Sequence, residues 1–413
     1  MSMESIVQSR CHRFALTQWA LVMLAGTFAV SGCAHVCKPA ETSARAARID
    51  VTKPPYDAKG DGITDNTEAL QRAIQAASPG KTVFLPPGEY RFSQSLVNTE
   101  NVTLLGAGRE VTVLRITNDD AYGINLASGL HVRGLTLRGN NTPSPRAHAF
   151  NGGNTVGAVI EDCLIENWGA VAILGADHSC GNVVRNNIIR NNAHEGVYFG
   201  TNSDGNTILR NHIYNCAKNG IDVNGSHNRI LYNVVHDIGK PGDSVDTVGI
   251  MAGNPAPNAA TNNLIHGNTV YRCATHGIIL WAVSKSHVVT ENTCYENAAY
   301  GIFLEKLGAD GQCIDHIVAR NVARGNGDYG IILEATENCV VQGNKAVGNG
   351  KDGIAVDSTN GPAQSNALIE NLCKWNKRYG LYVSAGAVSS YLESNRATRN
   401  AAGNIKDESE PNE

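Results

Sequence analysis

Short runs of alternating apolar and polar residues fill the second half of the chain, in a repeat marked by an asparagine and, nine residues later, a glycine. The clear pairs are Asn187 with Gly196, Asn211 with Gly220, Asn268 with Gly277, Asn292 with Gly301, Asn321 with Gly330, Asn344 with Gly353 and Asn371 with Gly380. Counting Gly249 of one interrupted repeat, the glycines recur every 23 to 29 residues. A fixed period of this size is typical of a solenoid.

Each glycine is followed by an aliphatic residue and, two positions later, by a second apolar residue, as in Val197 with Phe199 and Ile302 with Leu304. A period of two predicts strands. Two further apolar columns flank each asparagine, so a repeat holds about three short strands. Stacking by strand pairing then gives a parallel β-helix that rises about 4.8 Å per rung. Asparagine suits its turns, because it tolerates left-handed backbone conformations and its amide can bond to neighbouring rungs.

We expect the β-helix to span residues 49–405, preceded by one helix over 65–77 that covers its open end. Asp65 and Glu68 have the spacing of a capping box, and an apolar stripe follows them. The stripe consists of Leu70, Ala73, Ile74 and Ala77. Residues 406–413 form an acidic tail that we expect to be disordered.

Residues 1–33 have the pattern of an export signal, with Arg10 and Arg13 before an apolar stretch. The stretch ends in Val30-Ser31-Gly32-Cys33, which resembles a bacterial lipobox. The resemblance implies a lipid on Cys33 and an envelope lipoprotein, at the outer membrane or the periplasmic face. The alternative is an ordinary signal peptide that is cleaved nearby. Residues 34–48 would form the tether, and this anchor would be the sole membrane contact.

Composition narrows the choice of partner. The chain has 413 residues, 17% of them charged, with 43 glycines and a net charge of -4. No basic patch with interleaved aromatic residues is present, so we do not expect nucleic-acid binding. The 11 cysteines contain no CxxC pair, which argues against a zinc site. The oligomeric state, monomer or homo-oligomer, stays open.

Two N-terminal stretches carry a family resemblance: Asp57-Ala58-Lys59-Gly60-Asp61-Gly62 and Thr82-Val83-Phe84-Leu85-Pro86-Pro87-Gly88-Glu89-Tyr90. They resemble the opening of the pectate-lyase-like superfamily, in the branch with rhamnogalacturonase-type enzymes, phage tailspikes and mannuronan C5-epimerases. The resemblance implies an all-β, single-stranded, right-handed parallel β-helix and a saccharide cleft on the strands after the glycines. It is weak for the reaction, because one superfamily hosts many activities.

The family's catalytic motifs are missing. The rung that matches the Asp-Pro-His run of the C5-epimerases reads Gly169-Ala170-Val171-Ala172-Ile173-Leu174-Gly175, without acid or histidine. The paired aspartates and Gly-His-Gly of polygalacturonases are also absent. We interpret Asp119 and Asp120 as a solvated turn.

Strand parity places the second and fourth residues after each glycine on the outside. Aromatic rings and polar groups there, with longer loops beside them, predict a substrate-binding groove. Its predicted binding residues are Asn224, Asp246, His276, Trp281, Phe303 and Tyr382.

The first predicted cluster is an acid–base set from neighbouring rungs: His194, Glu195, Tyr198 and Asp222, with Lys240 on an inserted loop. Asp243 lies on the same loop. Such a set suits the removal of a proton beside a uronate carboxylate, with Lys240 neutralising charge. The alternative is a group of polar turn residues without a catalytic role.

The second predicted cluster is a row of three carboxylates, Glu305, Glu334 and Asp357, at one position in successive rungs. Carboxylates about 5 Å apart repel, so either a cation binds there or their pKa values rise. Ca²⁺ is the natural candidate, since it binds several oxygens. The alternative is an acidic ladder splayed into water.

Three functions follow as hypotheses. The leading one is a lyase that acts by β-elimination on an acidic, uronate-containing polysaccharide. The second is a glycoside hydrolase with Glu305 and Glu334 as a close carboxylate pair. The third is a non-catalytic carbohydrate-binding or envelope scaffold protein.

Overall fold

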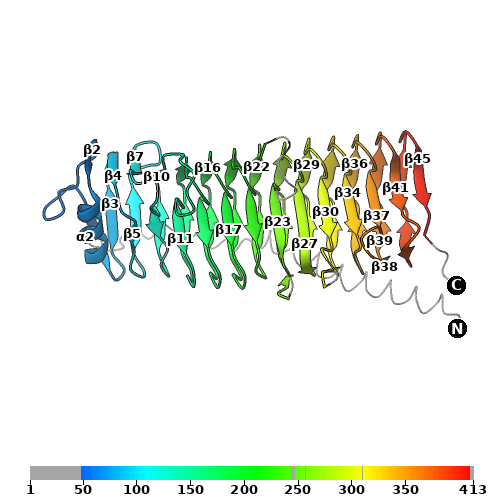
Figure 1. The fold of residues 1–413 in the computed structure, drawn as a ribbon, viewed down its shortest axis with the longest axis horizontal. Coiled ribbons are helices and arrows are strands. Elements are labelled where there is room, and N and C mark those ends of the chain that lie inside the picture. The colour runs from blue at the N-terminus through cyan, green and yellow to red at the C-terminus, as the bar shows by residue number, and fades with distance from the viewer. Residues whose placement is uncertain (1–47, 241, 243–246, 256, 309, 410–413) are drawn as a thin grey trace, which may run out of the picture. The chain divides into compact units, whose positions relative to one another are not determined.

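The computed structural model describes residues 48–409, apart from 241, 243–246, 256 and 309. The predicted signal, Cys33 and nearly all of the predicted tether lie outside the described residues, as do Asp243 and Asp246. Within the described part, the chain winds into a parallel β-helix whose rungs follow one another from helix α2 to the last strand, β45 (Figure 1). Every pairing between its strands is parallel, as the period predicts, so the fold class is confirmed.

Three sheets form the walls of the β-helix, and each rung contributes one short strand to each wall. Wall A contains 14 strands. They are β1 (Arg48–Asp50), β3 (Thr82–Leu85), β6 (Thr103–Gly106), β9 (His131–Arg133), β12 (Val159–Glu161), β15 (Val183–Arg185), β18 (Thr207–Leu209), β21 (Arg229–Leu231), β25 (Leu264–His266), β28 (Val288–Thr290), β32 (Ile317–Ala319), β35 (Val340–Gln342), β39 (Ala367–Ile369) and β43 (Tyr391–Glu393).

Wall B also contains 14 strands and follows wall A after a tight turn in each rung. They are β2 (Asp61–Asp65), β4 (Gly88–Phe92), β7 (Thr112–Ile116), β10 (Thr136–Arg138), β13 (Leu164–Glu166), β16 (Ile188–Arg190), β19 (His212–Tyr214), β22 (Val234–His236), β26 (Thr269–Tyr271), β29 (Thr293–Tyr295), β33 (Val322–Arg324), β36 (Lys345–Val347), β40 (Leu372–Lys374) and β44 (Arg396–Thr398).

Wall C holds the strands that follow the glycines. They are β5 (Leu96–Val97), β8 (Ile124–Asn125), β11 (Phe150–Gly152), β14 (Ile173–Gly175), β17 (Val197–Phe199), β20 (Ile221–Val223), β23 (Ile250–Asn254), β27 (Ile278–Lys285), β30 (Ile302–Glu305), β34 (Ile331–Glu334), β37 (Ile354–Asp357), β41 (Tyr379–Val383) and β45 (Gly403–Asp407). Beyond this path, β24 (Ala260–Thr261) and β31 (Gln312–Ile314) pair with the end of β27, and β38 (Ala363–Gln364) pairs with β42 (Ala387–Val388).

Helix α2 (Thr67–Ala77) lies at the N-terminal end of the β-helix (Figure 1). It buries the predicted stripe of Leu70, Ala73, Ile74 and Ala77. The predicted capping box is wrong, since the N-cap is Asn66, whose side chain makes no cap hydrogen bond, while Asp65 Oδ1 accepts from Thr67 N at 2.9 Å. The Asn66 amide instead holds the preceding loop, accepting from Lys59 N at 2.6 Å and donating to Lys59 O at 3.0 Å.

The other boundaries differ slightly from the prediction. Strand β1 begins at Arg48, the last residue of the predicted tether, and β45 continues to Asp407, inside the predicted tail. Within the described residues, no helix has the length and apolar character of a membrane span.

The turn between walls A and B contains a ladder of asparagines, buried except for the last one, Asn395, which confirms the predicted role of the repeated residue. Asn292 Nδ2 donates to Asn321 Oδ1 in the next rung at 3.0 Å and to Ile265 O at 2.9 Å. The ladder consists of Asn187, Asn211, Asn233, Asn268, Asn292, Asn321, Asn344, Asn371 and Asn395. It satisfies buried polar groups that would otherwise cost free energy.

The repeated glycine has a steric reason. A Cβ atom on Gly301 would lie 2.5 Å from the carbonyl oxygen of Gly330 in the next rung. The backbones approach each other there too closely for any side chain. The chain therefore enters wall C at the same point in each rung, and this fixes which later residues point outward.

Candidate functional site

Wall C carries three outward columns of side chains, which together we call the wall C face. Column 1 holds the residues that precede the glycines or their equivalents: Tyr122, His148, Val171, Glu195, Asn219, Val248, His276, Tyr300, Tyr329, Asp352 and Tyr379. Column 2 holds Asn125, Asn151, Leu174, Tyr198, Asp222, Met251, Ile279, Phe303, Ile332, Ala355 and Tyr382. Column 3 holds Gly253, Trp281, Glu305, Glu334 and Asp357. Strand parity therefore predicted columns 2 and 3 correctly.

The first predicted cluster comes together on β17 and β20. We call His194, Glu195, Tyr198 and Asp222 the acid–base cluster. His194 Nδ1 is hydrogen-bonded to Glu195 Oε2, and the Glu195 carboxylate is 4% exposed. The His194 side chain is 44% exposed, so its other ring nitrogen is available at the surface. A buried carboxylate that binds Nδ1 fixes the ring and leaves Nε2 to accept a proton.

Tyr198 and Asp222 are neighbours in register on β17 and β20, and Asn224 bridges them. With its amide oriented to satisfy these groups, Asn224 Nδ2 donates to Asp222 Oδ1 at 3.1 Å, and Asn224 Oδ1 accepts from the Tyr198 hydroxyl at 3.1 Å. Asn219 Nδ2 donates to Asp222 Oδ2 at 3.1 Å. Burial, and then the Asp222 charge, raise the pKa of Tyr198. The phenol is therefore protonated at neutral pH and suited to donate a proton.

Two lysines belong to the surroundings of the cluster. Lys218 Nζ lies 3.7 Å from Glu195 Oε1, a contact that the sequence reasoning missed. Lys240, predicted to neutralise substrate charge, is exposed in the described part of its loop. Its role stays a prediction.

His148 is a second missed residue. Its Nδ1 accepts a hydrogen bond from Val171 N at 3.1 Å, and its ring stacks on Tyr122 at 5.7 Å. Burial lowers the pKa of His148, and the charges of His194 and Glu195 also act on it. His148 therefore belongs electrostatically to the acid–base cluster. The sequence signal for His148 is its position one residue before Ala149, which is the equivalent of the repeated glycine.

The C-terminal half of the face carries an apolar strip outside the β-helix. Its buried members are Val248, Met251, Ile279, Phe303, Ile332 and Ala355. Four half-buried rings pack against it, and we call them the ring platform: Trp281, Tyr300, Tyr329 and Tyr382. Two of these rings, Tyr300 and Tyr329, come from column 1 and were missed, whereas Trp281 and Tyr382 were predicted.

Phe303 and His276 support the platform from below. Phe303 is 5% exposed, and its ring meets Tyr300 edge-on at 5.0 Å. His276 is also 5% exposed and stacks on Tyr300 at 4.5 Å. Burial lowers the pKa of His276 to about 4, so the ring is neutral at pH 7. Its Nδ1 has no hydrogen-bond partner within the described residues.

The predicted row of carboxylates is also in register: Glu305, Glu334 and Asp357 occupy one column on β30, β34 and β37. We call them the acidic row. The Asn360 side-chain amide donates to Glu334, and Thr359 Oγ1 donates to Asp357 Oδ1 at 2.5 Å. Burial, and then the Asp357 charge, raise the pKa of Glu334. In the described part of the chain, no three or more His, Cys, Asp or Glu side chains are grouped to hold a metal ion. Calcium binding here stays a prediction.

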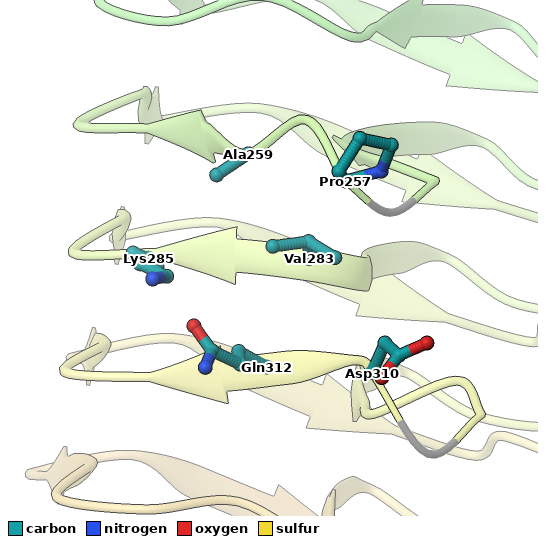
Figure 2. Close-up of a pocket in the computed structure, with 6 residues that line it drawn as sticks. All are labelled: Pro257, Ala259, Val283, Lys285, Asp310 and Gln312. Atoms are coloured by element: carbon teal, nitrogen blue, oxygen red, sulfur yellow. The ribbon is translucent and has the colours of Figure 1, made fainter.

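A pocket of about 440 Å³ lies beyond the face, where β27 pairs with β24 and β31. Figure 2 shows that its lining comes from three successive rungs. The lining residues are Pro257, Ala259, Val283, Lys285, Asp310 and Gln312. None of the predicted site residues lines it, so we assign the candidate site to the face.

Comparison with protein families agrees with this architecture. Residues 54–142 match the family "Rhamnogalacturonase A/epimerase, pectate lyase-like", and residues 100–257 match "Right handed beta helix region". The chain is a right-handed β-helix protein whose N-terminal part matches a pectate-lyase-like family. Residues 310–413 of this β-helix protein also match "Periplasmic copper-binding protein (NosD)".

Individual relatives cover short parts of the β-helix protein. Mannuronan C5-epimerase AlgE6 of Azotobacter vinelandii is 37% identical over 124 residues, which is 25% of this chain and 14% of that protein. Alginate lyase 7 of the same organism is 44% identical over 72 residues, 15% of this chain and 8% of that protein. The chain thus spans a minor part of the length of these curated relatives.

Solved structures extend the likeness to nearly the whole fold. The A-module of the same AlgE6 has a TM-score of 0.67 at 20% identity and covers 88% of this chain and 100% of that one. The GH87 α-1,3-glucanase of Streptomyces thermodiastaticus has a TM-score of 0.58 at 16% identity, covering 89% and 66%. PfbA, a surface adhesin of Streptococcus pneumoniae, has a TM-score of 0.53 at 15% identity, covering 87% and 93%. At these identities the likeness concerns the fold alone.

The rung with residues 169–175, which lacks the Asp-Pro-His run of the C5-epimerases, also lacks an acid on the wall C face. Leu174 of β14 fills column 2 between Asn151 and Tyr198. No acid occupies that position, and the acid–base groups of column 2 begin one rung later, with Tyr198. The relatives of this chain include mannuronan C5-epimerases and an alginate lyase, and a GH87 α-1,3-glucanase shares its fold.

Proposed function

We propose that the protein is a polysaccharide lyase that cleaves an acidic, uronate-containing chain by β-elimination at the acid–base cluster. The observation that carries the proposal is the exposed His194 ring held by the buried Glu195 carboxylate, in the same rung as the Tyr198 hydroxyl and one rung from Asp222. Relatives whose names include a mannuronan epimerase and an alginate lyase support a uronate as the substrate.

The proposed step balances within these groups. His194 Nε2 takes the proton from C5 of the uronate, beside its carboxylate. The C4–O bond breaks, a C4=C5 double bond forms, and the Tyr198 hydroxyl gives its proton to the leaving oxygen. Tyr198 then regains a proton from His194 or water. A positive group beside the carboxylate makes the C5 proton more acidic, and Lys218 and Lys240 are the candidates on this part of the face.

The test is a panel of polymannuronate, pectate and glycosaminoglycans, incubated with the protein with and without added Ca²⁺. A lyase produces an unsaturated uronate, which absorbs in the ultraviolet. We expect absorbance to rise on at least one uronate polymer. A flat signal on all of them, in both conditions, contradicts the proposal. Binding without turnover would favour a non-catalytic carbohydrate-binding protein.

A second candidate is glycoside hydrolysis by the acidic row. The raised pKa of Glu334 is the observation that favours it, because a general acid must hold its proton near the working pH. Glu305 on the neighbouring strand would be its partner. Release of reducing ends without ultraviolet absorbance, lost in Glu305→Gln and Glu334→Gln, selects this reaction. Full hydrolytic activity in both variants removes it.

We also propose that residues 1–33 direct export and that Cys33 carries a lipid anchor, although these residues lie outside the described part. Labelling with a radioactive fatty acid tests the anchor. We expect label on the wild-type protein and none on Cys33→Ser. Equal labelling of both proteins contradicts lipidation at Cys33.

A further inference from the structure

Wall B carries an unusual run of like charges, on a different wall from the proposed active site. Arg91 on β4, Arg115 on β7 and Arg138 on β10 are direct register partners. We call these three residues the arginine column. Neighbouring strands lie about 4.8 Å apart, and like charges directly opposite each other on a sheet are destabilising. The positive charge of the arginine column therefore needs neutralising partners.

The Glu89 carboxylate lies at ion-pair distance from all three guanidinium groups, and Arg138 has a second, closer partner in Glu166. The Glu89 oxygens lie 3.8 Å from Arg91 Nε, 3.6 Å from an Arg115 nitrogen and 3.9 Å from an Arg138 nitrogen. These are ion-pair distances and too long for good hydrogen bonds. Because Arg138 also pairs with Glu166, the imbalance lies at Arg91 and Arg115, which among the described residues share the one negative charge of Glu89.

Arg91 and Arg115 also have N–H groups that make no hydrogen bond to a side chain of the described residues. Within the described residues, Arg115 makes no side-chain hydrogen bond and no other ion pair. Arg91 Nε is buried without a hydrogen-bond partner. Asp65, the register partner of Arg91 on β2, accepts instead from the Thr67 and Ser93 hydroxyls.

Further along the same column the arginines have closer partners, beginning with Arg138 itself. The buried Glu166 carboxylate accepts from Arg138 Nε and Arg190 Nε, both at 2.8 Å. Arg190 in turn donates to the Tyr214 hydroxyl at 3.0 Å. Beyond it, rings stack on one another, as Tyr271 and Tyr295 do at 4.6 Å.

We propose that the arginine column is a second, non-catalytic binding site for a polyanionic polysaccharide. The side chains of Arg91, Arg115 and Arg138 are 37%, 38% and 31% exposed, so a ligand can reach them. A guanidinium group binds a carboxylate or sulfate with paired N–H groups. The rise of one rung, about 4.8 Å, is close to the length of one pyranose unit, so a chain lying along the axis presents about one acidic sugar to each arginine. This site would hold a long chain on the molecule independently of any reaction on wall C.

The experiment measures binding by affinity electrophoresis and calorimetry on the wild-type protein, an Arg115→Ala/Arg138→Ala variant and a matched control, Arg229→Ala/Arg396→Ala. The control removes two exposed arginines that make no ion pair among the described residues. The probes are polymannuronate, dextran sulfate and neutral dextran. We expect the wild type and the control to bind both polyanions in a salt-dependent way, and the column variant to bind them about tenfold more weakly.

Arg115→Ala alone is the safeguard against misfolding, because the Arg115 side chain makes a single long ion pair. We expect it to keep the wild-type melting temperature and still to lose affinity. Unchanged affinity in both column variants overturns the proposal, as does equal binding of neutral dextran. Binding to anionic phospholipid vesicles but to neither polysaccharide overturns it too. Ultraviolet turnover of short oligouronates is measured separately, and we expect the column variants to keep it at the wild-type level, so failure of the lyase proposal is distinguishable.

Discussion

The acid–base cluster and the ring platform with its neighbouring acidic row lie on the same wall. The carboxylates of the cluster and those of the acidic row differ in burial and in hydrogen-bond partners. In the N-terminal half, Glu195 and Asp222 are buried and each is bound by neighbouring side chains. In the C-terminal half, the acidic row is half-buried at the border of the ring platform, and Glu334 and Asp357 are bound by residues of a loop. Buried carboxylates orient other groups, whereas half-exposed ones beside rings suit contacts with sugar hydroxyls. This difference agrees with our proposal of a chemical site in the N-terminal half and a binding site in the C-terminal half.

The largest expected effect separates the chemistry from the binding. His194→Ala should lower turnover of a uronate polymer by about 100-fold or more, because loss of a general base costs that much. Affinity for the polymer should change little, since the ring platform is intact. Initial rates by ultraviolet absorbance, together with calorimetric affinity, measure both.

His227→Asn is the matched control for this experiment. His227 is exposed on the turn before wall A, at a left-handed φ of 57° that asparagine tolerates. We expect wild-type rates for it. If His194→Ala keeps full activity, the division between the two halves is wrong.

A second change tests the binding half. Trp281→Ala should weaken polysaccharide binding by about tenfold, since it removes a large half-buried ring from the platform. The effect should appear in KM and leave kcat nearly unchanged. Trp375→Asn is the control, because Trp375 is 54% exposed at a turn away from the face. If both variants lose the same affinity for the polysaccharide, the effect does not depend on the position of the ring, and the ring platform is not the binding site.

The smallest effect concerns pH and the acidic row. The pKa of Glu334 is raised in the folded protein, so the folded state binds more protons than the unfolded state above the ordinary glutamate pKa. The wild type therefore loses stability as the pH rises through this window, up to the raised pKa. Glu334→Gln should melt a few degrees higher than the wild type at pH 7 and show no gain below about pH 4.

Thermal unfolding at a series of pH values measures the difference. The same measurement with added Ca²⁺ tests metal binding. If the acidic row binds the ion, Ca²⁺ should raise the melting temperature of the wild type more than that of Glu334→Gln. A melting temperature for Glu334→Gln below that of the wild type at pH 7 would contradict the raised pKa.

Much of this architecture could be predicted from the sequence. The spacing of Asn292 and Gly301 has local causes, an amide ladder and a backbone contact that excludes a Cβ atom, and these recur in the rungs between Asn187 and Gly380. Once the glycine fixes where each wall C strand begins, parity decides that Trp281, Glu305 and Glu334 share a column. The helix over the N-terminal end followed from its apolar stripe, although its capping did not, because Asn66 is used by the preceding loop.

Only the tertiary structure decided which side chains from different columns interact and which are buried by their neighbours. The charge of His194 acts on the pKa of His148 although 46 residues separate them in the sequence. Phe303, outward by parity, is buried beneath rings from another column. The reason is physical: the repeat sets position and direction along each wall, whereas burial, pairing and pKa depend on the neighbours that the winding of the chain brings alongside.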